Sequence, residues 1–114
     1  MLWDRADVLV TSRLTYAEGR AALAAINRAG GFSPDRFLQA KREFDERFRE
    51  LDQIEPTEAV CGFAGDVAER HGLWGYDAVH LASAMTLPLD ELVFATSDRL
   101  LLQAATAEGI STGT

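Results

Sequence analysis

The apolar positions of the chain form short uninterrupted runs, separated by longer segments with helical periodicity. The clearest runs are residues 8–10 and 92–96, and weaker candidates lie at residues 53–55 and from Ile110 onward. Short apolar runs rich in β-branched residues are typical of strands buried in a parallel sheet. Strands that alternate with helices therefore predict an α/β fold with a parallel sheet.

Helix start and stop signals divide the rest of the chain. A helix is predicted after residues 8–10, with Thr11 or Ser12 as its cap, and it ends near Gly30. Ser33 and Pro34 predict the start of a second helix. The predicted helices end near residues 29, 51, 71, 86 and 108, and glycine or proline follows four of these ends. The mixed charges of the second helix favour a solvated surface with i,i+4 pairs, although Arg42 and Arg49 could instead contact a phosphate backbone.

The helix predicted from about Tyr76 to Thr86 is mostly small and apolar, which indicates that it is largely buried. It nevertheless carries Asp77 at its start and His80 one turn later, on the same face. An acid at the start of a buried helix is either a cap or part of a site. His80 is interpreted as a hydrogen-bonded core histidine, with orientation of Asp77 as a secondary role.

Composition limits the class of protein. The chain has 114 residues, 47% of them hydrophobic, which is enough for one domain. The net charge of −7 argues against broad binding of nucleic acid through a basic surface, but not against a nuclease whose acids hold metal ions. A single cysteine, Cys61, gives neither an intrachain disulfide nor a zinc signature. No run approaches the roughly 20 apolar residues of a membrane helix, so no membrane association and a cytoplasmic location are predicted.

Three acids are expected at one edge of the sheet. Asp98 directly follows the strongest strand, Glu18 lies about two turns into the first predicted helix, and Asp77 starts the buried helix. In parallel α/β sheets, ligands bind beyond the carboxyl ends of the strands. Carboxylates that converge there repel one another unless they are protonated or bridged by a cation, and their oxygens suit Mg²⁺ or Mn²⁺. The structural alternatives are that Asp77 and Asp98 are helix caps and that Glu18 pairs with Arg13 or Arg20.

The surroundings of these acids resemble PIN-domain proteins, and in particular the VapC-type toxins of bacterial toxin–antitoxin pairs. The matching segments are residues 14–18, 75–84 and 94–98, and the resemblance covers nearly the whole chain. It implies a type II toxin that acts as a metal-dependent endoribonuclease, with Glu18, Asp77 and Asp98 as catalytic residues and ligands of Mg²⁺ or Mn²⁺. Thr96 matches the hydroxyl residue that accompanies the last acid. The implied partners are an RNA substrate, a cognate antitoxin protein and a second copy in a homodimer.

The chain departs from the family pattern at its start. Family members begin with a central strand that ends in an aspartate, a principal metal ligand. Asp4 follows too few residues for a strand, and Asp7 precedes its strand and so lies at the wrong edge. The sequence is therefore interpreted as one PIN-like domain over residues 1–114, N-terminally incomplete. The expected fold has three layers, with a short parallel sheet that lacks its first, central strand and is flanked by helices.

Three hypotheses follow from this pattern. The first is a ribonuclease toxin whose true start lies upstream. The second is a catalytically inactive PIN remnant that still binds a protein. The third is a structural α/β domain in which the acids are only caps and ion-pair partners.

Overall fold

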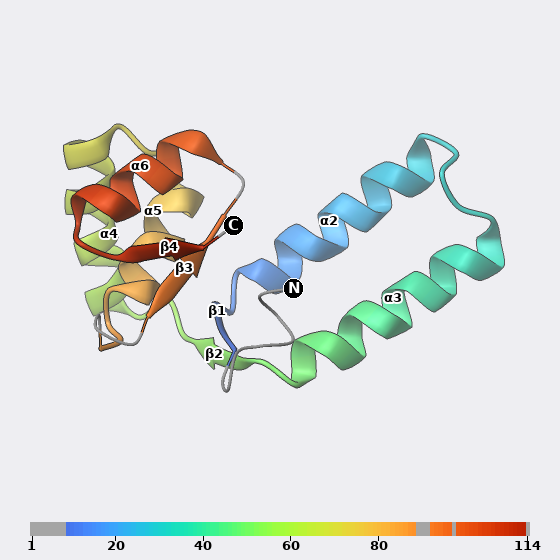
Figure 1. Ribbon diagram of the computed structural model, residues 1–114. Coiled ribbons are helices and arrows are strands. Elements are labelled where there is room, and N and C mark those ends of the chain that lie inside the picture. Colours follow the sequence, from blue (N-terminus) through green and yellow to red (C-terminus); the bar gives the residue numbers. More distant parts are fainter. Residues whose placement is uncertain (1–8, 89–91, 97, 114) are drawn as a thin grey trace.

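The computed structural model describes residues 9–88, 92–96 and 98–113, and it is an α/β protein (Figure 1). The elements in chain order are β1 (Val10–Ser12), α2 (Thr15–Arg28), α3 (Pro34–Arg49), β2 (Asp52–Ile54), α4 (Glu58–His71), α5 (Gly75–Ala84), β3 (Val93–Ala95), α6 (Arg99–Ala107) and β4 (Ser111–Gly113). Each predicted helix is present, and the strands expected near residues 53–55, 92–96 and 110 lie within two residues of their predicted positions. The predicted α/β class is confirmed.

Local capping chemistry explains why several helices begin and end where the sequence predicts. The Ser33 hydroxyl accepts a hydrogen bond from the backbone N–H of Arg36 at 3.1 Å, at the start of α3. Thr57 accepts one from the N–H of Val60 at 3.2 Å, at the start of α4. Gly72 ends α4 with a positive φ of 66°, a conformation that glycine adopts without a side-chain clash. These ends depend on neighbouring residues alone.

The boundary between β1 and α2 differs from the prediction. Thr11 and Ser12, expected as helix caps, belong to β1, and α2 begins at Thr15. Ser12 is buried, and its hydroxyl accepts a hydrogen bond from the N–H of Leu14 at 3.3 Å. The reason is pairing across the sheet, because Thr11 and Ser12 lie opposite Gln53 and Ile54 of β2. Val8, predicted as the first residue of this strand, lies outside the described residues.

The strands form two small parallel sheets rather than one. β1 pairs with β2, from Val10 opposite Asp52 to Ser12 opposite Ile54, and β3 pairs with β4, from Val93 opposite Ser111 to Ala95 opposite Gly113. Among the described residues, no ladder joins β1 to β3. The two strand pairs are separate in the described part of the chain, so the single parallel sheet predicted from the sequence is not present there (Figure 1).

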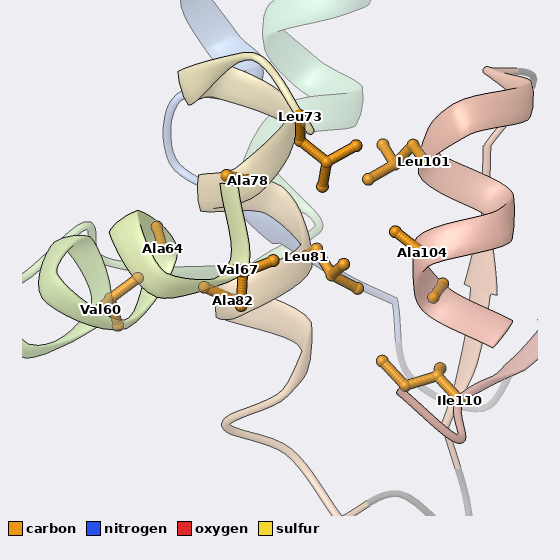
Figure 2. Packing of buried hydrophobic residues seen from close by; sticks show 11 residues of the cluster. Val60, Ala64, Val67, Leu73, Ala78, Leu81, Ala82, Leu101, Ala104 and Ile110 are labelled. Atoms are coloured by element: carbon orange, nitrogen blue, oxygen red, sulfur yellow. The ribbon is translucent and has the colours of Figure 1, made fainter. Parts of the chain in front are cut away.

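The hydrophobic core lies between α4, α5 and α6. Leu81 on α5 and Val67 on α4 are fully buried, and Leu101 and Ala104 of α6 face them across the cluster (Figure 2). Ile110, just before β4, closes one end of this cluster. The prediction that the helix after Gly75 is largely buried is confirmed, since half of the residues of α5 are buried. This helix also packs against β1, which places the start of α5 near the start of α2.

Helices α2 and α3 form a hairpin that extends away from this core (Figure 1). Tyr16 contacts Phe44 and Phe48 between the two helices, with ring centroids 5.6 and 5.3 Å apart. The small residues Ala21, Ala22 and Ala25 lie on one face of α2 and are exposed, and no residue of α2 is buried. Packing against α3 uses Tyr16 and Gly19 instead of these alanines. No helix in the described ranges is long and apolar enough to cross a membrane.

Candidate functional site

Asp77 lies in the first turn of α5 and is half-buried. The N-cap of this helix is Trp74, whose side chain makes no capping hydrogen bond. The interpretation of Asp77 as an N-cap is therefore wrong, because the helix starts two residues before it. A carboxylate in the first turn is still favoured by the helix dipole.

Asp98 is the N-cap of α6. Its Oδ1 accepts a hydrogen bond from the N–H of Leu101 at 2.9 Å, so the capping interpretation is confirmed for this residue. The hydroxyl of Thr96 accepts a hydrogen bond from the N–H of Asp98 at 3.1 Å and fixes the turn between β3 and α6. Capping uses one carboxylate oxygen, and the same carboxylate has a second oxygen that can face a ligand. Ser97, which precedes Asp98 and could also cap this helix by its residue type, lies outside the described residues.

Glu18 contacts His80 and not an arginine. Glu18 Oε2 lies 3.1 Å from His80 Nε2, with side-chain exposures of 44% and 16%. The expected pairing with Arg13 or Arg20 is wrong, because Arg13 binds Glu55 and Arg20 donates to the Tyr16 hydroxyl. Arg13 is held by Glu55, just after β2, and Arg20 by Tyr16 and by Asp45 of α3. His80 is thus the partner that brings Glu18 to α5.

The electrostatics of Asp77 link the three acids. Desolvation by burial raises the pKa of Asp77 above its usual 3.8, and the negative charges of Asp98 and Glu18 raise it further, while His80 acts in the opposite direction. The carboxylates of Asp98 and Glu18 thus lie near enough to act on Asp77. Ionising Asp77 at neutral pH costs free energy, and a bound cation would offset that cost.

The donor chemistry fits a hard divalent cation, since the three acids offer carboxylate oxygens of the kind that Mg²⁺ and Mn²⁺ prefer. In the part of the chain that the structure describes, no group of three or more His, Cys, Asp or Glu side chains is gathered closely enough to hold a metal ion. The acids are therefore electrostatic neighbours rather than a closed ligand set.

His80 is the residue whose position the sequence predicted least well. Its place one turn after Asp77 indicated a shared face, and packing with an orienting role toward Asp77 was expected. In the structure it is largely packed and hydrogen-bonded, as expected, and its partner is Glu18 of α2. The signal available in the sequence was the i,i+3 spacing of Asp77 and His80, which did not identify a partner on another helix.

The fold and this cluster define a small α/β protein with parallel strand pairs and an acidic centre contributed by three helices. No family model matches the chain. Two curated proteins do: Ribonuclease VapC45 of Mycobacterium tuberculosis (strain CDC 1551 / Oshkosh) and Ribonuclease VapC49 of Mycobacterium tuberculosis (strain ATCC 25618 / H37Rv). Each is 41% identical to the chain over 108 residues, which is 95% of this chain and 75% of the relative. The chain belongs to the VapC ribonuclease family, and the resemblance seen in its sequence is confirmed.

Proposed function

We propose that this protein is the endoribonuclease toxin of a type II toxin–antitoxin pair and hydrolyses RNA phosphodiester bonds with Mg²⁺ or Mn²⁺. The observation that carries the proposal is that the charges of Asp98 and Glu18 both raise the pKa of Asp77, so a cation beside Asp77 would be favourable. Membership of the VapC ribonuclease family supports the choice of RNA as substrate.

Asp77 and Asp98 are the proposed ligands of the metal, with Glu18 as the third carboxylate. A divalent ion at such a centre activates water and neutralises charge during phosphodiester hydrolysis. Thr96 holds the backbone that carries Asp98, and His80 holds the carboxylate of Glu18 toward α5. The overall charge of −7 opposes RNA binding, so a cation between the acids and a phosphate also supports substrate binding.

The proposed partners follow from the same assignment. They are an RNA substrate, a cognate antitoxin protein that covers the acidic centre, and a second copy of the chain in a homodimer. The proposed location is the cytoplasm, where RNA is available.

The direct test is cleavage of a mixed-sequence RNA by the 114-residue chain in Mn²⁺, in Mg²⁺ and in EDTA. Cleavage that requires the metal and falls by at least about a hundredfold in Asp77→Asn supports the proposal. Glu69→Gln is the control, because it makes the same change from carboxylate to amide at an exposed position near the end of α4. Metal-independent cleavage, or equal cleavage by Asp77→Asn, would contradict the assignment.

A second candidate is a catalytically inactive protein-binding module. The exposed hairpin of α2 and α3 favours it, because Ile26 and Leu38 are each 45% exposed on helices that extend from the core. Isolated amphipathic helices of this kind offer surface to a partner chain. RNA cleavage that stops in EDTA, returns when Mn²⁺ is added and is absent in Asp77→Asn would exclude an inactive module.

A further inference from the structure

The positive charge of the chain is concentrated in the hairpin of α2 and α3. Residues 15–49 contain seven of the eleven Lys and Arg residues and five of the eighteen acids, whereas residues 50–114 contain two basic residues and eleven acids. The hairpin is therefore net positive and the segment that follows it is strongly negative. Because the hairpin extends away from the core (Figure 1), its positive charge is presented to solvent.

Arg42 and Arg49 form an exposed row along α3. They are seven positions apart, close to two helical turns, so their side chains share a face and lie about 10 Å apart along the helix axis. In the described part of the chain neither arginine forms an ion pair. Arg49 Nε donates to the backbone carbonyl of Asp45 at 3.3 Å. Both charges are thus available to a ligand.

Asp45, which lies between the two arginines on this face, is held from α2. Its Oδ1 accepts a hydrogen bond from the Tyr16 hydroxyl at 2.8 Å and lies 3.8 Å from Nη1 of Arg20. Arg20 also donates to the Tyr16 hydroxyl, at 2.7 Å. The carboxylate of the row is therefore already occupied, and Arg20 brings a third guanidinium group to it.

A hollow of about 270 Å³ lies beside the row and is lined by Tyr16, Asp45, Phe48 and Arg49. The guanidinium group is planar and can donate two parallel hydrogen bonds to the oxygens of one phosphate. Arginines arranged along a helix beside a hollow therefore suit an extended ligand with repeated negative charges.

RNA is the polyanion that this surface fits best, because phosphates recur along its backbone whatever its sequence. The two similar curated proteins are named ribonucleases. The acidic segment after the hairpin repels RNA, so an approaching strand is steered toward the positive hairpin. An acidic segment of a protein partner would also carry negative charge, and the experiment below distinguishes the two.

We propose that Arg20, Arg42 and Arg49 form a contact surface for the phosphate backbone of RNA, separate from the acidic centre. Arg20 follows Glu18 by two positions, about 200° around α2, so it lies on the side of the helix away from the Glu18 contact with His80. The choice of RNA rests on the proposed ribonuclease function, but the surface needs neither the metal nor the acids of that site. Phosphate contacts supply affinity and orientation without reading the bases.

The test measures the affinity for a fluorescein-labelled, mixed-sequence single-stranded RNA by anisotropy, in EDTA and over a range of KCl concentrations. Each phosphate contact to a single strand contributes about 0.7 to the slope of log affinity against log salt. We expect Arg42→Gln with Arg49→Gln to make this slope shallower by about 1.4, and Arg42→Lys with Arg49→Lys to retain it. The matched control is Arg36→Gln with Arg47→Gln, which removes the same charge from another face of α3 and should change the slope little.

Glu46 provides a test of opposite sign. It is exposed, four positions after Arg42 and three before Arg49, so its carboxylate lies beside the row and repels a phosphate there. Glu46→Gln should therefore strengthen RNA binding at low salt. Weaker binding by this variant would contradict the surface.

The outcomes separate the surface from the proposed function. Equal slopes for the Arg42/Arg49 variant and its control overturn the surface, and so does a wild type that binds no RNA in EDTA. An unchanged slope with a shifted sedimentation mass assigns the arginines to a protein contact and also overturns it. Binding that needs Arg42 and Arg49, without metal-dependent cleavage by the wild type, supports the surface and contradicts the ribonuclease assignment. Metal-dependent cleavage with an unchanged slope does the reverse.

Discussion

His80 Nε2 lies 3.1 Å from Glu18 Oε2, and this contact joins α5 to the first turn of α2 across 62 positions of the sequence. Glu18 lies on a helix without buried residues, so packing does little to fix its position. His80 is held on the largely buried α5 and supplies that fixed point. The third carboxylate of the acidic centre is thus positioned by a hydrogen bond rather than by the core.

Breaking this contact should change activity more than stability. We expect His80→Ala to lower the free energy of unfolding by only about 1 kcal/mol, because one hydrogen bond to a partly exposed carboxylate is lost. Metal-dependent cleavage should fall, since Glu18 is no longer directed toward α5. Chemical denaturation and RNA cleavage measured on the same preparations check both statements.

Glu18→Gln is the companion variant, because it retains a hydrogen-bonding side chain toward His80 and removes the charge. Its free energy of unfolding should stay within about 0.5 kcal/mol of the wild-type value, as for most substitutions at surface positions. Its affinity for Mn²⁺, measured by titration calorimetry, should fall. Unchanged Mn²⁺ affinity in this variant would remove Glu18 from the proposed ligands.

Asp98 has a structural role and a proposed chemical role, and two substitutions separate them. Asparagine caps helices about as well as aspartate, so Asp98→Asn should unfold at nearly the wild-type denaturant concentration. Asp98→Ala loses the bond to the N–H of Leu101 and should be destabilised by about 1 kcal/mol. Both variants should lose metal-dependent cleavage. An Asp98→Asn protein that cleaves RNA normally would leave capping as the whole role of this residue.

The raised pKa of Asp77 predicts a pH dependence of stability. Burial and the charge of Asp98 disfavour its ionised form in the folded protein, so the contribution of Asp77 to stability is full below pH 3.8 and is lost as the pH rises through its folded pKa. Asp77→Asn cannot ionise. In EDTA, the variant should therefore melt at a higher temperature than wild type at neutral pH, and the difference should disappear toward low pH.

The cation provides the matching control for Asp77. Mn²⁺ should raise the melting temperature of the wild type at neutral pH, because it offsets the repulsion among the acids. It should raise that of Asp77→Asn much less. Equal shifts in both proteins would show that Mn²⁺ binds elsewhere.

Local signals in the sequence predicted the helices well. Ser33 and Thr57 cap α3 and α4 through bonds to residues three positions away, so the sequence alone contains both partners. The end of α4 at Gly72 is equally local. The placement of β1 was less certain, because Thr11 and Ser12 look like caps and belong to a strand through pairing with β2, some 42 positions distant.

The side chain that pairs with Glu18 is set by contacts between segments that are distant in the sequence. The sequence offered Arg13 and Arg20 as close partners for Glu18, but Arg13 binds Glu55, and Arg20 binds Tyr16 and Asp45. The choice of His80 follows from the packing of α5 against β1, which no local pattern contains. The sequence predicts Asp77, Asp98 and Glu18 at one edge of a single sheet, but the described strands form two separate pairs, and the structure shows only that the charges of Asp98 and Glu18 act on Asp77.

Another acidic residue, Glu108, lies outside the acidic centre and ties the end of α6 to the end of α4. Its carboxylate accepts from Arg70 and contacts His71 Nε2 at 2.6 Å, and its side chain is 12% exposed. The hydrogen bond to His71, followed by that to Arg70, holds the pKa of Glu108 below its usual 4.5. Its stabilising effect is present above pH 4.5 and is lost as the pH falls through the folded pKa.

Glu108→Gln should therefore lower the free energy of unfolding at neutral pH by about 1 kcal/mol, a reduced figure because Arg70 is half exposed. The deficit should shrink below pH 4.5, where the wild type also loses its charge. Glu69→Gln, at an exposed position of α4, is the control and should match wild type throughout. A deficit that is independent of pH would mean that Glu108 acts through packing rather than charge.

Gly19 lets α2 and α3 approach each other, and its replacement tests the hairpin. A Cβ at this position would lie 2.2 Å from Cζ of Phe44, whose ring also contacts Tyr16 and Phe48. Because these three rings are packed together, Phe44 cannot move without disturbing the others. Gly19→Ala should destabilise the protein by about 1–3 kcal/mol, the usual cost of overpacking.

Gly62→Ala within α4 is the control, because it makes the same chemical change where no neighbouring atom lies within 4 Å of the added Cβ. It should stabilise the protein by about 0.5–1 kcal/mol through helix propensity. Opposite signs in urea denaturation would establish that α2 and α3 pack in solution through Gly19 and Phe44, whereas a stabilising Gly19→Ala would show that the hairpin opens there.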